Sequence, residues 1–177
     1  AKTEPKHKSW VGGTLFKVKY TESNLQSISL FYGNGSGMNE ALLSDCPSGK
    51  NVFCSIDLDL SAYDGQQIQY YFVTRDPFRS AASKTYTLNV DTVSPVISLL
   101  SPANSATYGT SVRITANITE KVTLQYSDNG GAFKSLCKNC NFYNNAKTFA
   151  KGAHALVVRA TDKAGNIDEE SVSFTVA

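Results

Sequence analysis

Hydrophobic and polar residues alternate with a period of two along most of this chain. The alternating runs span residues 16–20, 28–32, 56–60, 68–72 and 86–90 in the first half, and 112–118, 122–126, 156–160 and 172–176 in the second. Such alternation predicts half-buried β-strands, each with one side facing a core and the other facing solvent. Gly, Asn and Asp between the runs indicate turns, and no window of 11 residues has a convincing helical period.

The pattern also contains an internal repeat of close to ninety residues. Asp76 and Asp162 each close an apolar run, and residues 85–87 and 171–173 follow them at the same distance. Because a unit of this size can enclose its own core, we expect two homologous modules in tandem, at residues 1–90 and 91–177. Short strands and frequent turns predict that each module is an antiparallel β-sandwich of about seven strands.

The two modules differ at their starts. Aligning Thr21 with Thr119 places the counterpart of the strand at 96–99 at or before residue 1. We therefore expect the first strand of module one to be truncated or missing.

The four cysteines predict two local disulfides, Cys46–Cys54 and Cys137–Cys140. Three pairings are possible, but local pairing is favoured because each module should be self-sufficient. Such bonds persist outside the reducing cytosol, which favours an extracellular or cell-surface location. Redox and zinc chemistry are the alternatives for Cys137-Lys-Asn-Cys140. They fit less well, because residues 141–145 look like a loop and zinc requires four ligands close together.

Two short motifs match the acceptor sequence for N-glycosylation and agree with an extracellular location. They are Asn34-Gly-Ser and Asn117-Ile-Thr. Asn117 has the same strand parity as Arg113 and Thr115, so we expect its side chain on the solvent face.

Composition and charge argue against several classes of function. The 177 residues are 41% hydrophobic and 11% aromatic, which is enough for packed cores. No apolar stretch approaches the roughly 20 residues of a membrane span, so no membrane insertion is expected within this segment. The net charge of +2 is spread evenly, without a basic block, which argues against a nucleic-acid partner.

No motif in the chain indicates catalysis. His7 lies in a polar N-terminal arm, and His154 has the parity of inward residues, so a packed or edge histidine is expected. Asp91, Asp162 and Asp168 on expected loops are candidate oxygen ligands for calcium. Because no spaced series of aspartates accompanies them, we expect no cofactor, with calcium as the alternative.

Aromatic residues outside the inward positions are the better indication of binding. They are Trp10, Phe31, Tyr71, Phe78, Phe142 and Tyr143. Large amphipathic side chains on loops favour recognition, although each of these rings could also cover an edge of a sandwich. The predicted binding loop is 137–145, where a disulfide would order Phe142 and Tyr143 in advance.

Two motifs of the second module resemble immunoglobulin-like or fibronectin-III-like modules of bacterial and archaeal secreted and cell-surface proteins. They are Asp-Thr-Val-Ser-Pro-Val-Ile at 91–97 and Ala-Thr-Asp-Lys-Ala-Gly-Asn at 160–166. The resemblance is greatest to the immunoglobulin-like repeats of archaeal surface proteins, and it is weaker in module one, where 75–79 replaces the Ala-Gly-Asn turn. It implies an all-β fold of two tandem immunoglobulin-like sandwiches. Turn motifs specify a fold and identify no ligand.

These observations favour a non-enzymatic extracellular segment of a cell-surface protein. It would act as a stalk, an adhesion region or a cell–cell interaction region, with other cell-surface proteins or glycans as partners. The alternative is an accessory region of a secreted protease or glycoside hydrolase that binds substrate or acts as a spacer. The full-length reading frame would distinguish the two, because it would contain either a membrane anchor or a hydrolase domain.

Overall fold

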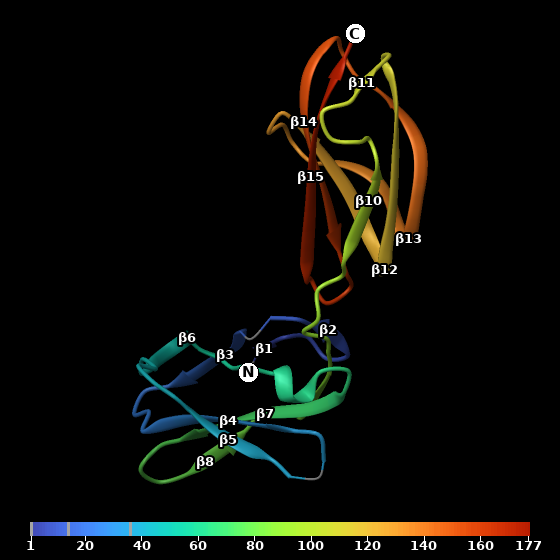
Figure 1. The fold of residues 1–177 in the computed structure, drawn as a ribbon. Coiled ribbons are helices and arrows are strands. Elements are labelled where there is room, and N and C mark those ends of the chain that lie inside the picture. The colour runs from blue at the N-terminus through green and yellow to red at the C-terminus, as the bar shows by residue number, and fades with distance from the viewer. Residues whose placement is uncertain (1, 14, 36) are drawn as a thin grey trace. The chain divides into compact units, whose positions relative to one another are not determined.

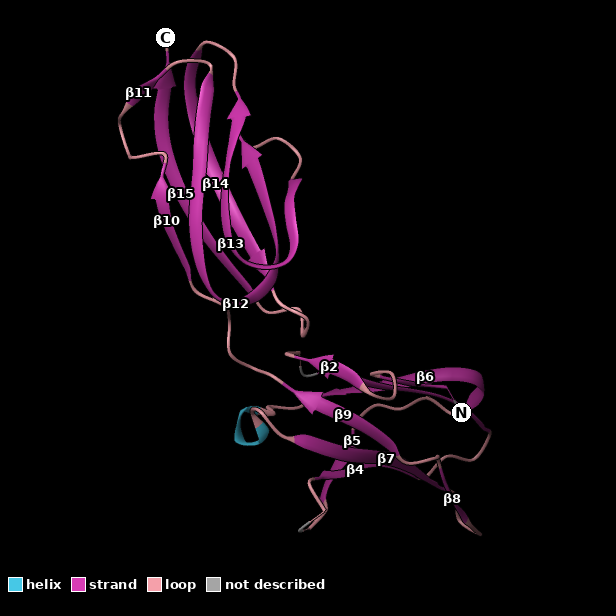
Figure 2. Ribbon diagram, turned by 90° about the vertical axis from the view of Figure 1, so that its right-hand side faces the viewer, coloured by secondary structure: helices cyan, strands magenta, loops and turns pink. Residues whose placement is uncertain are grey.

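The computed structural model describes residues 2–13, 15–35 and 37–177. These residues form β-strands and one short 3-10 helix, η1 (Ser61–Tyr63), as Figures 1 and 2 show. The chain divides into two compact units, Ala1–Val93 and Ser94–Ala177, which we describe separately. The all-β fold predicted from the alternation is confirmed. Among the described residues, no helix has the length and apolar character needed to span a membrane.

The first unit has two sheets. The smaller sheet contains β1 (Lys2–Glu4), β3 (Leu15–Glu22) and β6 (Gly49–Asp57), in the order β1-β3-β6. The strands of the larger sheet are β2 (Ser9–Val11), β4 (Ser27–Gly33), β5 (Asn39–Leu43), β7 (Gln67–Arg75), β8 (Ser80–Ala82) and β9 (Tyr86–Val90). Their order is β2-β9-β7-β4-β5, with β8 also paired to β7. The pairing of β2 with β9 is parallel, and the other pairs are antiparallel.

Aromatic rings fill the centre of the first core. Phe16 on β3 contacts Tyr70 on β7 edge to face, with 5.1 Å between ring centroids, and Phe72 packs against Tyr70 in the same manner. The hydroxyl of Tyr70 donates to the carbonyl oxygen of Pro5 and lies 3.4 Å from Thr3 Oγ1, so this buried polar atom has partners. Burial raises the pKa of Tyr70 to about 12.

The second unit is built from one hydrogen-bonded sheet that folds over its own core. Its strands are β10 (Ile97–Ser101), β11 (Thr107–Tyr108), β12 (Ser111–Asp128), β13 (Lys134–Thr148), β14 (Gly152–Thr161) and β15 (Ile167–Val176). The first part of β12 pairs with β10, and the second part pairs with β14, while β13 pairs with both parts. Strands β15 and β11 continue the sheet, and their mutual pairing is parallel.

Both disulfides join the pairs that the sequence predicts. Cys46 and Cys54 link the β5–β6 connection to β6, with 5.2 Å between their Cα atoms. Cys137 and Cys140 both belong to β13, with 6.2 Å between their Cα atoms. By restricting the unfolded chain, the first bond contributes about 2–3 kcal/mol of stability and the shorter ring somewhat less.

Two expectations about strands in the first unit can be compared with the structure. Of the two alternatives for the first strand of module one, truncated or missing, the structure contains a short strand, β1, which pairs with β3 through Thr3 and Val18. Thr3 is its single buried residue, and a run with one inward position leaves no visible alternation. The run at 56–60 is only partly a strand, since β6 ends at Asp57 and the next residues lead into η1.

The division between the units falls between Val93 and Ser94, close to the expected boundary between residues 90 and 91. Homology of the two units stays a prediction, because it rests on the sequence repeat.

Substitutions on β12 test which of its faces is buried. Ile114 is completely buried, whereas Ser111 on the same strand is exposed. Ile114→Asp should destabilise the second unit by more than about 3 kcal/mol, because an unpaired carboxylate would enter the core. Chemical denaturation monitored by circular dichroism of the backbone should show this loss. Ser111→Asp is the control, and it should unfold like the wild type. Equal damage from both changes would contradict the assignment of faces.

Candidate binding surfaces

The predicted binding loop at 137–145 is not a loop. Phe142 and Tyr143 lie in β13, opposite Asn117 and Ala116 of β12. Tyr143 is buried in the core of the second unit, and only Phe142 faces solvent, with 53% of its surface exposed. The local composition of asparagine and lysine resembles a loop, but pairing with β12 along both of its parts makes this segment a strand. The expectation of a two-residue aromatic loop was therefore wrong for Tyr143.

Two of the predicted aromatics meet on the outward face of the larger sheet of the first unit. Phe31 on β4 lies directly opposite Tyr71 on β7, and their rings stack with centroids 5.1 Å apart and planes 9° apart. Both rings are half-buried. Leu42 on the neighbouring strand β5 adds an aliphatic side chain that is 66% exposed. We call the outward side chains of Phe31, Tyr71 and Leu42 the apolar face.

One ion pair borders the apolar face. Arg75 Nη1 donates to Ser29 Oγ at 3.0 Å and lies 3.5 Å from Glu40 Oε1. The guanidinium of Arg75 covers Ser29, which explains why this residue is fully buried at an outward position. The alternation in the sequence does not reveal this contact. Because both charged side chains remain partly exposed, the ion pair itself contributes little stability.

The turn between β7 and β8 presents the most exposed aromatic ring in the described chain. Phe78 is 90% exposed. Asp76 Oδ1 accepts hydrogen bonds from the backbone N–H groups of Phe78 at 2.7 Å and Arg79 at 2.8 Å. The N–H of Asp76 donates to the carbonyl of Arg79. These hydrogen bonds, the one from Phe78 first, lower the pKa of Asp76, so the carboxylate that orders the turn is charged at neutral pH.

The remaining exposed rings of the first unit have different surroundings. Trp10 on β2 is 39% exposed. Phe53 on β6, which the sequence pattern did not single out, is 49% exposed and lies under two ammonium groups. The Nζ atoms of Lys17 and Lys19 stand 4.6 and 5.4 Å from its ring centroid. Such cation–π contacts explain an outward ring without a partner molecule.

A hollow of about 480 Å³ opens beside β8 in the first unit. Its described lining contains hydroxyl groups and Lys84 but no histidine or carboxylate. The hydroxyl of Ser83 accepts from the N–H of Phe72 and donates to the carbonyl of Lys84, so it is engaged with the backbone. The described lining therefore offers no acid–base pair to activate a nucleophile.

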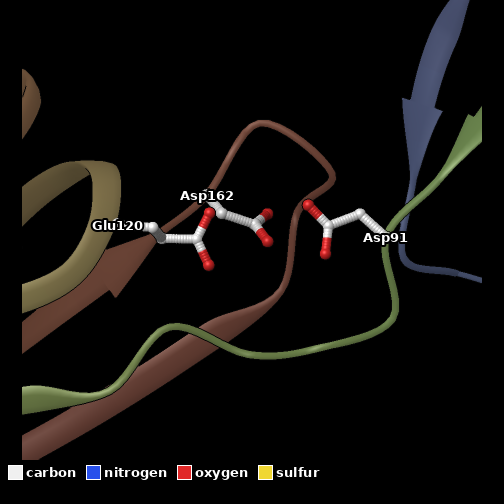
Figure 3. Close-up of side chains that lie close together, drawn as sticks. All are labelled: Asp91, Glu120 and Asp162. Carbon is white, nitrogen blue, oxygen red and sulfur yellow. The ribbon is translucent and has the colours of Figure 1, made fainter. Parts of the chain in front are cut away.

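The acidic residues considered for calcium have structural contacts. Asp162 follows β14, and its Oδ1 accepts from the N–H groups of Ala164, Gly165 and Asn166. Gly165 has φ +94°, which explains the glycine in this turn. Figure 3 shows the Asp162 carboxylate beside that of Glu120, which lies within β12, and oxygen atoms of the two come within 4.8 Å.

The other two acidic candidates also have contacts within their own units. Asp168 Oδ2 accepts from the N–H of Ile97 at 2.8 Å, which ties β15 to β10. Asp91 belongs to the first unit, where its N–H donates to the carbonyl of Val11. The Asp168 carboxylate thus has a role in the fold of the second unit, whereas the contact of Asp91 is made by its backbone.

His154 of β14 superficially resembles part of a catalytic arrangement. Its Nδ1 lies 2.9 Å from Asp128 Oδ1, but its Nε2 lies 2.9 Å from the carbonyl oxygen of Ala150. In a triad that second nitrogen would receive the proton of a nucleophile. Here both nitrogens face acceptors, and the rings of Phe149 and Phe174 enclose the imidazole. The packed histidine expected from strand parity is what the structure contains.

The two predicted glycosylation sites differ in their surroundings. Asn117 is exposed on β12, at the outward position that its parity predicts. Asn34 follows β4, and its Nδ2 donates to Gln66 Oε1 at 2.8 Å. The third residue of its motif, Ser36, lies outside the described residues.

Comparison with known proteins identifies the fold. No family model matches this sequence, and no curated protein is similar to it. The fibronectin(III)-like modules of Clostridium thermocellum CbhA match with a TM-score of 0.57 and 16% identity, over 99% of this chain and 93% of that chain. The FN1–FN3 domains of chicken CNTN1 match with a TM-score of 0.51 and 8% identity, over 100% and 64%. At these identities the likeness shows the fold alone, which is of the fibronectin-III-like or immunoglobulin-like class.

Stability of the second unit should depend on pH through His154. The hydrogen bond to the Ala150 carbonyl, followed by the Asp128 contact, raises the pKa of this imidazole above its ordinary value. Its stabilising contribution should be fully present below about pH 6.5 and should be lost as the pH rises through the raised pKa of the folded unit. Urea unfolding at pH 5.5–8.5 should show this loss in the wild type and not in His154→Gln. Parallel pH profiles for the two proteins would contradict it.

Proposed function

We propose that this chain is a non-enzymatic extracellular segment of a secreted or cell-surface protein, in which tandem immunoglobulin-like modules act as a stalk and as an adhesion or cell–cell interaction region. Its partners are other cell-surface proteins or glycans. We include in this proposal the resemblance of the sequence to archaeal surface repeats, and propose that the chain is part of a surface protein of that kind. The observation that carries the proposal is the ordered β7–β8 turn that holds Phe78 in solvent.

The chemistry of the two units supports this role. Both disulfides fit an extracellular protein, because reducing conditions would open them. The histidine–aspartate pair is engaged with a backbone carbonyl, and the described lining of the hollow beside β8 contains no histidine or carboxylate. The CbhA and CNTN1 structures are described as modules and domains of fibronectin type, and we extend that modular role to this chain.

An exposed ring on an ordered turn is well suited to recognition. Aromatic residues and arginine are enriched at the centres of protein interfaces, and the turn presents Phe78 next to Arg79, whose side chain is 85% exposed. Because Asp76 already fixes the backbone, binding would order few additional torsions. The apolar face lies on the same sheet as this turn, and it offers further area to a large partner.

Binding should depend on the ring of Phe78. Burying a phenylalanine side chain contributes about 1.5–3 kcal/mol, so Phe78→Ser should weaken binding at least ~10-fold. Fluorescently labelled protein should be titrated onto cells of the source organism and onto a glycan array. Phe53→Ser is the matched control, because Phe53 is also exposed but lies on β6 beneath two lysines.

A second variant separates the ring from the order of the turn. Asp76→Ala keeps Phe78 and removes the acceptor of its N–H, so it should give a smaller loss of affinity than Phe78→Ser.

The purified chain should also leave peptide and glycoside substrates unchanged. Equal effects of Phe78→Ser and Phe53→Ser would remove the turn from consideration, and substrate turnover would overturn the non-enzymatic function.

A further inference from the structure

Asn117 lies at the centre of an outward face of the second unit. On this face β12 pairs with β10 on one side and β13 on the other, so that Asn117 stands opposite both Ser98 and Phe142. All three residues are exposed. Because directly opposed residues of a sheet project to the same side, their side chains form one row, which we call the Asn117 row.

Phe142 is the exposed aromatic ring of the Asn117 row, and it has polar neighbours on β12 and β13. The next outward positions along the two strands are Thr115 and Asn144, and Asn144 Oδ1 accepts from Arg113 Nη1 at 2.9 Å and Thr115 Oγ1 at 3.3 Å. Phe142 itself is 53% exposed. A ligand that covers this exposed phenyl ring would bury apolar surface. The polar groups beside the ring could form hydrogen bonds with a ligand that is rich in hydroxyl groups.

The motif that begins at Asn117 is compatible with a modification made before folding. Thr119 is the third residue of Asn-Ile-Thr, and its Oγ1 accepts from the N–H of Val96 at 3.0 Å in the folded unit. Its own N–H donates to the Val96 carbonyl. The threonine is therefore accessible to a transferase before β10 joins β12, whereas the Asn117 side chain remains outside the core afterwards.

We propose that Asn117 carries an N-linked glycan whose first sugar packs on the ring of Phe142. In the transfer a bond forms between Asn117 Nδ2 and the anomeric carbon of the sugar. The bond from that carbon to a phosphate oxygen of a polyprenyl phosphate- or diphosphate-linked donor breaks. The lipid phosphate leaves with the electron pair, and one amide proton is released, so the step involves no oxidation or reduction.

The cross-strand geometry explains why the glycan would lie on this ring. Cβ atoms of directly opposed residues are about 4.5–5.5 Å apart, so a sugar on Asn117 starts within reach of the neighbouring side chain. The apolar face of a pyranose can cover the phenyl ring, while its hydroxyl groups meet the Asn144 side chain and Ser98. Asn34 lies in the turn after β4 and not in a strand, so it has no directly opposed residues of this kind. Its Nδ2 donates a hydrogen bond to Gln66 Oε1.

Mass spectrometry of the protein purified from its source organism tests the site. Trypsin releases residues 114–121, Ile-Thr-Ala-Asn-Ile-Thr-Glu-Lys, which isolates Asn117 from Asn34. We expect this peptide to carry a glycan mass that fragmentation assigns to Asn117. Recovery of the peptide only in its unmodified form would overturn the proposal.

Thermal unfolding tests the contact with Phe142. Enzymatic or chemical release of the glycan should lower the Tm of the wild type by several degrees and leave the Tm of Phe142→Ser unchanged. Ile167→Ser is the matched control, because Ile167 is 49% exposed on β15, a strand that contributes no residue to the Asn117 row, and it should keep the glycan-dependent shift. An equal shift in both variants, or no shift in the wild type, would overturn the packing on Phe142.

Discussion

Successive side chains of a strand point to opposite sides of the sheet, and both units depend on this constraint. Along β12, Val112, Ile114 and Ala116 are fully buried, while the residues between them meet solvent or neighbouring polar groups. Every inward position is thereby committed to packing, and chemistry placed there is enclosed. His154 illustrates the consequence, because the same alternation that brings it inward also surrounds it with Phe149 and Phe174. Recognition is left to outward side chains and turns.

The turns that follow β7 and β14 show how a fixed fold carries different surfaces. In each turn an aspartate accepts backbone N–H groups that follow it, Asp76 from two residues and Asp162 from three. The Asp162 turn is closed by Asn166, whose Nδ2 returns to the same carboxylate. The Asp76 turn instead projects Phe78. Since the carboxylate supplies the order, the residues within the turn can vary without cost to the sandwich.

The sequence was sufficient for the fold class, most strands, the disulfide pairs and the outward position of Asn117, because all of these depend on alternation or on short spacings. It was insufficient where distant segments decide. Ser29 is buried by a guanidinium from β7, and Tyr143 becomes a core residue because β12 pairs with a segment whose composition resembles a loop. The strand β1 has one inward residue, so it forms through its partner β3 and leaves no pattern of its own.

Exposed aromatic rings differ in how much a partner could gain from them, and the difference follows from their neighbours. Phe53 already has two ammonium groups over its ring, and Phe31 and Tyr71 cover part of each other. A partner at those places would replace interactions that exist in the free protein. Phe78 has most of its surface in water on a backbone that is already ordered, so its contact area would be gained almost in full. The turn between β7 and β8 is therefore a better candidate for recognition than the sheet faces, although the faces contain more aromatic rings.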